Sequence, residues 1–108
     1  MIHQLKIESA YFSQIETGIK TFEVRKNDRD YHIGDYLALN ELTDTPISPL
    51  HLYTGRCMIV RVVNILSDER FVKEGYVVMS IKPCKIIPAQ MQYGKVYDEG
   101  LNKLEYES

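Results

Sequence analysis

The order of hydrophobic and polar residues at the start of the chain predicts a β-strand followed at once by a helix. Residues 5–8 (LKIE) alternate with a period of two, which is typical of a strand with one buried face. From Ser9 the period lengthens, because the hydrophobic positions of residues 11–15 lie three and four positions apart. Ser9 is a suitable N-cap residue and Gly18 a suitable residue to end a helix, so we expect a helix of about two turns between them.

The rest of the chain predicts strands joined by polar connections. Segments with alternating or β-branched residues predict further strands at residues 20–25, 36–39, 56–65 and 76–81. Residues 26–30 (KNDRD) contain no hydrophobic residue and predict a solvated loop. Residues 43–52 contain Pro46 and Pro49, which lack the backbone donors that a strand needs, so this segment should be an exposed connection. The charged residues 67–70 (SDER) are expected to begin a helical turn.

This order of elements predicts an α+β protein. Helices do not alternate with strands, so a small, mainly antiparallel sheet or barrel with one or two short helices is favoured over a doubly wound parallel sheet. The 108 residues, 44% of them hydrophobic, suffice for one core and one globular domain. No hydrophobic run approaches the roughly 20 residues that span a bilayer, and the first residues lack a signal-peptide pattern. We therefore expect a cytoplasmic protein with no membrane partner.

Charge and cysteine content narrow the classes of function. The 13 basic and 15 acidic residues leave a net charge of −2, which argues against a protein that holds duplex DNA mainly by bulk counterion release. Residues 98–108 form an acidic tail with four acids and one lysine. Cys57 and Cys84 fit neither a disulfide framework nor a zinc-ligand spacing, so we expect no metal and two buried thiols. The sequence contains no P-loop, dinucleotide-binding fingerprint or nucleophile-elbow serine, and we expect no cofactor.

The strongest candidate site is the run of ionisable residues at positions 18–29. On the strand predicted there, Glu23 and Arg25 lie on the same face about 7 Å apart, so they are placed to share a ligand or to bond each other. An arginine offers a planar fork of donors to phosphates and base edges, and a glutamate accepts from amino groups and sugar hydroxyls. Lys20, at the corner before the strand, and Arg29, on the loop after it, are candidates for phosphate contacts.

Two interpretations of this cluster are open at this point. An acid and a base two residues apart on an exposed strand usually form a solvated pair that contributes little to stability. The alternative is a polar site that recognises a heterocycle, with Tyr31, Tyr36 or Tyr53 stacking on a base. Eight tyrosines in a small domain without tryptophan are more often packed in the core or at its rim, so no single tyrosine is favoured.

A family resemblance favours the functional interpretation. Residues 18–25 (GIKTFEVR) follow the pattern G-x-K-x-x-E-x-R and resemble the signature of the ASCH domain, named for activating signal cointegrator homology and placed in the PUA-like superfamily. Further blocks resemble, in the same order, a small bacterial and phage branch of that group whose function is uncharacterised: residues 21–30, 34–35, 53–56 and 74–78. The resemblance extends from residue 2 to residue 82. It implies a domain over residues 1–84 and a C-terminal extension over residues 85–108.

The resemblance implies a compact PUA-like β-barrel with a helix beside the signature strand. Such domains are thought to bind RNA or modified nucleosides in a cleft beside that strand. The chain is therefore expected to bind RNA or a nucleotide-like ligand. Lys20, Glu23 and Arg25 match the signature, and with Arg29 they are the expected ligand-binding residues.

The resemblance also implies an alternative activity. One ASCH lineage resembles a metal-independent amidohydrolase that deacylates N4-acetylcytidine with a lysine at the signature position, a threonine three residues later and a distant glutamate. Lys20 matches the lysine, whereas Glu23 stands where the threonine is expected. An enzyme of this kind would use Lys20 and Glu23 as catalytic residues. A third possibility is an accessory domain that acts through protein contacts, with the acidic tail as its handle.

Overall fold

The computed structural model describes residues 1–46, 48–84, 95–98 and 101–105. The elements in chain order are β1 (Ile2–Ile7), α1 (Ser9–Glu16), β2 (Phe22–Lys26), β3 (Tyr36–Leu42), β4 (Tyr53–Leu66), β5 (Tyr76–Pro83), β6 (Lys95–Asp98) and β7 (Leu101–Glu105). Every strand predicted from alternation is present, and so is the helix. Residues 27–30, 43–46 and 48–52 lie in connections, as expected, whereas Lys26 of the predicted loop is the last residue of β2. Residues 67–75 form turns, in which Val72 N–H donates to the Asp68 carbonyl at 2.9 Å.

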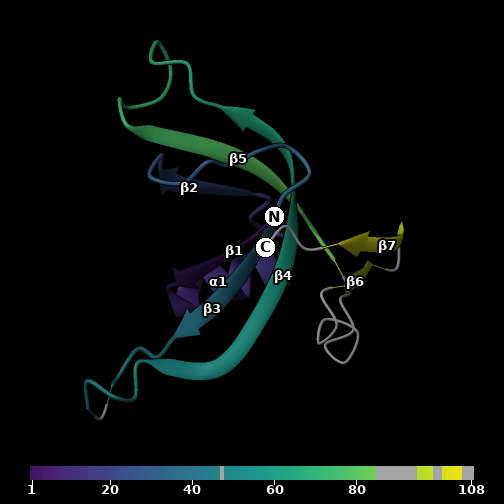
Figure 1. Ribbon diagram of the computed structural model, residues 1–108. Coiled ribbons are helices and arrows are strands. Elements are labelled where there is room, and N and C mark those ends of the chain that lie inside the picture. Colours follow the sequence, from purple (N-terminus) through teal and green to yellow (C-terminus); the bar gives the residue numbers. More distant parts are fainter. Residues whose placement is uncertain (47, 85–94, 99–100, 106–108) are drawn as a thin grey trace.

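Five strands form one curved sheet in the order β1-β3-β4-β5-β2. β1 runs parallel to β3, and the other neighbours are antiparallel. Figure 1 shows β4 as one long curved strand, and the sheet bends with it into a half-barrel. β1 and β2 are the two edges, and within the described residues no backbone pairing joins them. The expected small, mainly antiparallel α+β fold is thus confirmed, but the sheet is mixed and the barrel is open.

The core lies between the curved sheet and α1 (Figure 1). Its buried hydrophobic residues are Leu5, Ile7, Phe12, Ile15, Leu37, Leu39, Val60, Val62, Val77, Met79 and Ile81. Phe12 and Ile15 are almost completely buried, and burial of such side chains stabilises the fold by about 1.5–3 kcal/mol each. This packing holds α1 against the sheet and leaves Tyr11 at the surface.

The start of α1 differs from the prediction. Ser9 is the first helical residue, and the N-cap residue Glu8 makes no capping hydrogen bond through its side chain. Ser9 instead donates from its hydroxyl to Glu41 on β3 at 3.0 Å, and Thr54 on β4 donates to the other oxygen of that carboxylate at 2.8 Å. The buried Glu41 therefore ties the helix to two strands. The hydrogen bond of Ser9 is therefore a tertiary contact, which the sequence around Ser9 does not reveal.

The end of α1 is as predicted. Gly18 has a φ of 80°, a left-handed conformation that costs glycine little and most other residues more. Beyond it the backbone N–H groups of Ile19 and Lys20 both donate to the Gln14 carbonyl, at 2.9 Å and 3.0 Å. This turn reverses the chain directly into β2. It also brings Lys20 back beside the helix.

The cysteines are not both buried, contrary to the prediction. Cys57 is exposed and Cys84 is half-buried. On β4 the side chains of Val60 and Val62 face the core, and a period of two places Cys57 on the opposite, outer face. A run rich in valine and isoleucine does not identify which of its positions face inward.

The C-terminal extension predicted for residues 85–108 lies largely outside the described residues. Within it, β6 and β7 pair in antiparallel register. In the described part of the chain, no helix is long and apolar enough to cross a membrane.

Candidate functional site

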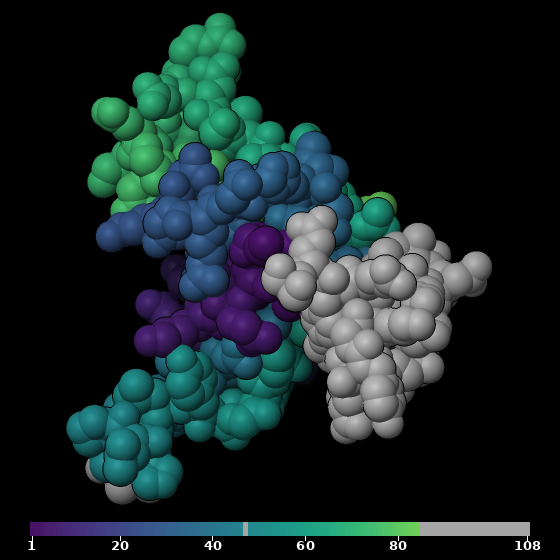
Figure 2. Space-filling view, viewed as in Figure 1, coloured from purple at the N-terminus to yellow at the C-terminus, as the bar shows by residue number. Residues whose placement is uncertain are grey.

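We call the surface between the edge strands β1 and β2 the seam. Two pockets open along this seam. The first pocket has a volume of about 690 Å³ and is lined by Lys6, Ile7, Glu8, Tyr11, Gln14, Ile19, Lys20, Phe22, Glu23, Val24, Arg25 and Leu42. The second has a volume of about 360 Å³ and is lined by Gln4, Leu5, Lys6, Arg25, Lys26, Asp28, Arg29, Tyr31, Asn40 and Tyr53. Figure 2 shows the purple N-terminal residues at the surface beside the blue residues that follow β2. Lys6 and Arg25 belong to both pockets.

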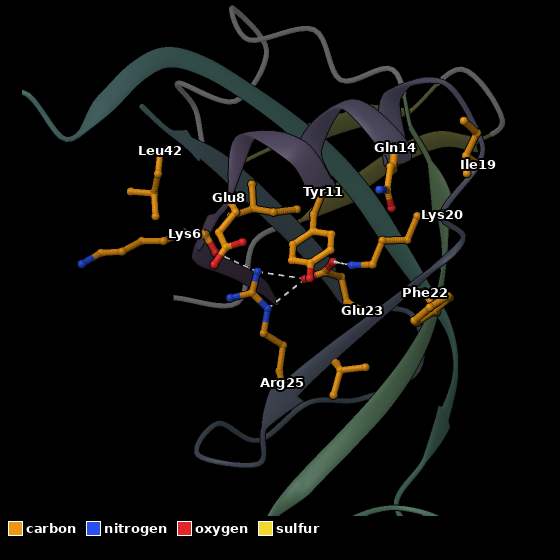
Figure 3. A pocket seen from close by; sticks show the side chains of 12 residues that line it. Lys6, Glu8, Tyr11, Gln14, Ile19, Lys20, Phe22, Glu23, Arg25 and Leu42 are labelled. Carbon is orange, nitrogen blue, oxygen red and sulfur yellow. Dashed lines mark hydrogen bonds and ion pairs between the residues drawn. The ribbon is translucent and has the colours of Figure 1, made fainter. Parts of the chain in front are cut away.

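Glu23 is a buried carboxylate at the inner wall of the first pocket, with 3% of its side chain exposed. It lies opposite the core residue Met79 in the pairing of β2 with β5, and directly opposite residues share a face of a sheet. Its Oε1 accepts a hydrogen bond from Lys20 Nζ, and its Oε2 accepts one from Arg25 Nε at 2.9 Å (Figure 3). Both oxygens of the acid are therefore engaged by cations. Glu23 therefore fixes the positions of the two cationic side chains.

Lys20 is held in a cage of one acid and two rings. Besides its bond to Glu23, its ammonium lies 4.8 Å from the ring centroid of Tyr11 and 5.4 Å from that of Phe22. Such cation–π contacts are worth about 0.5–2 kcal/mol, depending on desolvation. Only 12% of the Lys20 side chain is exposed. The chain turn after Gly18 and the position of α1 together fix this charge at the pocket wall.

Arg25 connects the two edges of the sheet. Its Nη2 lies 2.8 Å from Glu23 Oε2 and donates to the Lys6 carbonyl of β1, also at 2.8 Å. Among the described residues, Nη1 has no hydrogen-bond partner, so the outer part of the guanidinium can donate to a guest. About a fifth of the side chain is exposed (21%).

The burial of side chains along β2 is opposite to what their hydrophobicity predicts. Glu23 is buried, whereas Phe22 and Val24 are about half exposed. The core lies on the face of Glu23, opposite Met79, so Phe22 and Val24 are on the face that points away from the core. With Tyr11, which is also exposed, Phe22 and Val24 supply hydrophobic surface to the first pocket. Sequence reasoning missed Tyr11 and Phe22 as site residues. One indication in the sequence pointed to Tyr11 as a site residue. Tyr11 directly precedes the buried Phe12, so it lies at the side of the helix, next to the face that packs on the sheet.

The structure brings Lys20, Glu23 and Arg25 together but places Arg29 in the second pocket. The Arg29 side chain is exposed and forms no hydrogen bond or ion pair with another described residue. Arg25 is the link between the two groups, since it lines both pockets.

The three tyrosines proposed for stacking have different positions. Tyr31 and Tyr53 line the second pocket, whereas Tyr36 is buried in the protein, which removes it from the three alternatives. Burial raises the pKa of Tyr31, and the positive charges of Arg29 and Arg25 offset this only in part. Its phenol is therefore neutral at physiological pH.

The buried pair of His3 and Asp35 lies behind Tyr31 in the wall of the second pocket. The ring of His3 packs edge-on against Tyr31 with centroids 4.7 Å apart, and His3 Nε2 lies 2.8 Å from Asp35 Oδ2. The same oxygen of Asp35 accepts the backbone N–H of His32 at 2.8 Å. Burial would raise the pKa of Asp35, but the bonds from His3, from His32 and from the amino terminus together lower it below its usual value.

The first pocket presents cationic side chains and aromatic rings. In the described part of the chain, no serine, threonine or cysteine lines this pocket. No group of three or more His, Cys, Asp or Glu side chains in the described ranges is arranged to hold a metal ion.

Comparison with known proteins shows the family to which the chain belongs. The model of the family described as "Domain of unknown function (DUF3850)" matches residues 2–81, which is most of the chain. The chain belongs to this family. The DUF3850 match includes every residue that lines the two pockets.

A phage protein is a relative of this DUF3850 chain. It is the "Uncharacterized 12.9 kDa protein in GpA 3'region" of Escherichia phage P2, and the two are 36% identical over 69 residues. The aligned region is 62% of this chain and 58% of the length of the phage protein.

Proposed function

We propose that this DUF3850 protein binds single-stranded RNA or a nucleotide-like ligand in the first pocket. The observation that carries the proposal is the arrangement around Glu23, whose buried carboxylate holds Lys20 and Arg25 at one wall of a pocket of about 690 Å³. Because the two cationic side chains are already held in place, binding a polar ligand costs less side-chain entropy.

The aromatic rings beside Lys20 support the same ligand class. Tyr11 and Phe22 present exposed rings to the pocket, and single-stranded nucleic acids are recognised largely by stacking on such rings and by contacts to base edges and phosphates. In this proposal Arg25 contacts a phosphate or a base edge, Lys20 neutralises phosphate charge, and the exposed surface of Tyr11 or Phe22 stacks on the base.

We further propose that the domain is a PUA-like member of the ASCH group. The G-x-K-x-x-E-x-R pattern of residues 18–25 supports this, since its lysine, glutamate and arginine are the side chains that meet in the pocket. The half-barrel with α1 beside the first pocket is compatible with it.

Binding is favoured over amide hydrolysis by the same geometry. Both oxygens of Glu23 accept hydrogen bonds from cations, which leaves the carboxylate poorly placed to take a proton from water. The hydrolase alternative would also require a serine, threonine or cysteine nucleophile, and none lines the pocket in the described part of the chain. Release of acetate from N4-acetylcytidine by the wild type, but not by Lys20→Ala, would replace the binding proposal with the enzyme.

The proposal is tested by fluorescence anisotropy with a labelled twelve-nucleotide RNA of random sequence. We expect Lys20→Ala and Arg25→Ala to weaken binding and to lower the salt slope by about one each, whereas Lys73→Ala and Arg70→Ala, outside both pockets, leave binding unchanged. Tyr11→Ala removes an exposed ring and none of the hydrogen-bond partners of Glu23, and it should weaken binding about tenfold. Equal titrations for the wild type and all site variants, each confirmed as folded by circular dichroism, would overturn the proposal.

A further inference from the structure

We infer that the second pocket holds the phosphate next to the nucleotide bound in the first pocket, so that the ligand is a single strand of at least two nucleotides. This inference rests on the proposed function and extends it from a ligand class to a minimum ligand length.

The two pockets are consecutive compartments of one seam. They share Lys6 and Arg25, and the hydrogen bond from Arg25 Nη2 to the Lys6 carbonyl at 2.8 Å crosses the seam between them. A ligand that passes this crossing would place its linking group beside the guanidinium of Arg25. A phosphodiester suits that position, because an arginine fork donates well to phosphate oxygens.

The charge of the second pocket favours an anion. Its lining has four basic side chains, namely Lys6, Arg25, Lys26 and Arg29, and one acidic side chain, Asp28. In the described part of the chain, Lys6, Lys26 and Arg29 form no ion pair within the protein. Three cations without partners around about 360 Å³ repel one another, and a bound phosphate would relieve that repulsion.

The remaining lining favours a nucleotide over an acidic peptide. Tyr53 is about half exposed, and Tyr31 is fixed against the edge of His3, so the pocket offers ring surface beside its cations. Rings next to cations can bind a base and its neighbouring phosphate together, whereas the carboxylate side chains of an acidic peptide do not stack on rings.

Isothermal titration with short ligands tests the inference. The probes are nucleoside 5′-monophosphates and 5′-phosphorylated dinucleotides, in RNA and DNA forms, with hexaglutamate as the peptide arm. We expect dinucleotides to bind the wild type about tenfold more tightly than monophosphates. Arg29→Ala should remove most of that advantage, because it should weaken dinucleotide binding far more than monophosphate binding. Arg70→Ala, a surface arginine outside both pockets, is the matched control.

The outcomes separate this inference from the proposed function. Equal affinities for monophosphates and dinucleotides, with both lost in Lys20→Ala, would overturn the inference and keep the function. Binding of hexaglutamate that Arg29→Ala weakens, without any dinucleotide advantage, would assign the second pocket to an acidic peptide and also overturn the inference. Failure of every nucleotide probe would overturn the proposed function. A dinucleotide advantage in either the RNA or the DNA arm supports the inference and identifies the strand.

Discussion

Arg25 Nη2 donates to the backbone carbonyl of Lys6 at 2.8 Å, across the gap between the two edge strands of the half-barrel. In a closed barrel, backbone pairing would join these strands. Here one side chain makes the connection, and the space on either side of it remains open as a pocket. The residue that joins the edges is thus also the residue shared by both proposed binding compartments.

Replacing this arginine by lysine should separate its charge from its geometry. Arg25→Lys keeps the positive charge but cannot hold Glu23 and the Lys6 carbonyl with a planar fork, so we expect faster hydrogen exchange of the β1 amides and about tenfold weaker RNA binding. Hydrogen-exchange mass spectrometry and anisotropy measure the two effects. Arg70→Lys is the control and should change neither. Unchanged β1 exchange would show that the bond does not join the edges in solution.

Glu23→Gln should destabilise the fold far more than the same substitution at Glu16. Glu23 is buried and balances two cations, and its neutralisation leaves both without a counter-charge, at a cost of about 2–3 kcal/mol. Glu16 pairs with Arg56 at 2.8 Å, but about half of each side chain is exposed, so Glu16→Gln should cost less than about 1 kcal/mol. Urea denaturation measures both. Equal losses would contradict the structural role given to Glu23.

Ser9→Ala should loosen the attachment of α1. The variant removes one of two hydroxyl donors to the buried carboxylate of Glu41, which should lower the free energy of unfolding by about 1–2 kcal/mol. Ser13→Ala lies on the exposed side of the same helix and should change stability by less than about 0.5 kcal/mol. Thermal unfolding distinguishes the two. A loss no larger than that of Ser13→Ala would mean that the Glu41 contact does not anchor the helix.

Asp35→Asn should lower stability in a pH-dependent way. The pKa of Asp35 is below its usual value in the folded protein, so its ionised form contributes stability above the unfolded-state pKa, and this contribution is lost as the pH falls through the lower folded-state pKa. We expect a loss of about 1–3 kcal/mol near neutral pH that shrinks below about pH 4. Urea denaturation at several pH values follows this difference, with Asp30→Asn, an almost fully exposed acid, as the control. A difference that is constant down to pH 3 would contradict the linkage.

Much of the fold could be predicted from the sequence because local periodicity controls it. The alternation of residues 5–8, the helical spacing of residues 11–15 and the left-handed Gly18 are short-range features, and each appears where it was expected. The parallel pairing of β1 with β3 is not local. It depends on β2 crossing to the far edge to pair with β5, and no residue pattern within either strand encodes that partner.

That Lys20, Glu23 and Arg25 lie together could be predicted from the sequence, but which of them is buried could not. Lys20, Glu23 and Arg25 stood out by type and spacing, but Glu23 was expected to face the ligand and instead is buried between two cations. Alternation separates the two faces of a strand without showing which one is covered, so the burial of Glu23 could not be predicted. The contribution of Tyr11 depends on how α1 packs over the sheet, which only the tertiary structure determines.

Nuclear magnetic resonance of the isotope-labelled protein, titrated with an RNA tetranucleotide, tests the central claim most directly. If the seam is the binding surface, the largest changes in amide resonances will map to Lys6, Tyr11, Lys20 and Arg25 and will extend to Arg29. Changes confined to the outer face of β4, around Cys57, with the seam resonances unmoved, would contradict it.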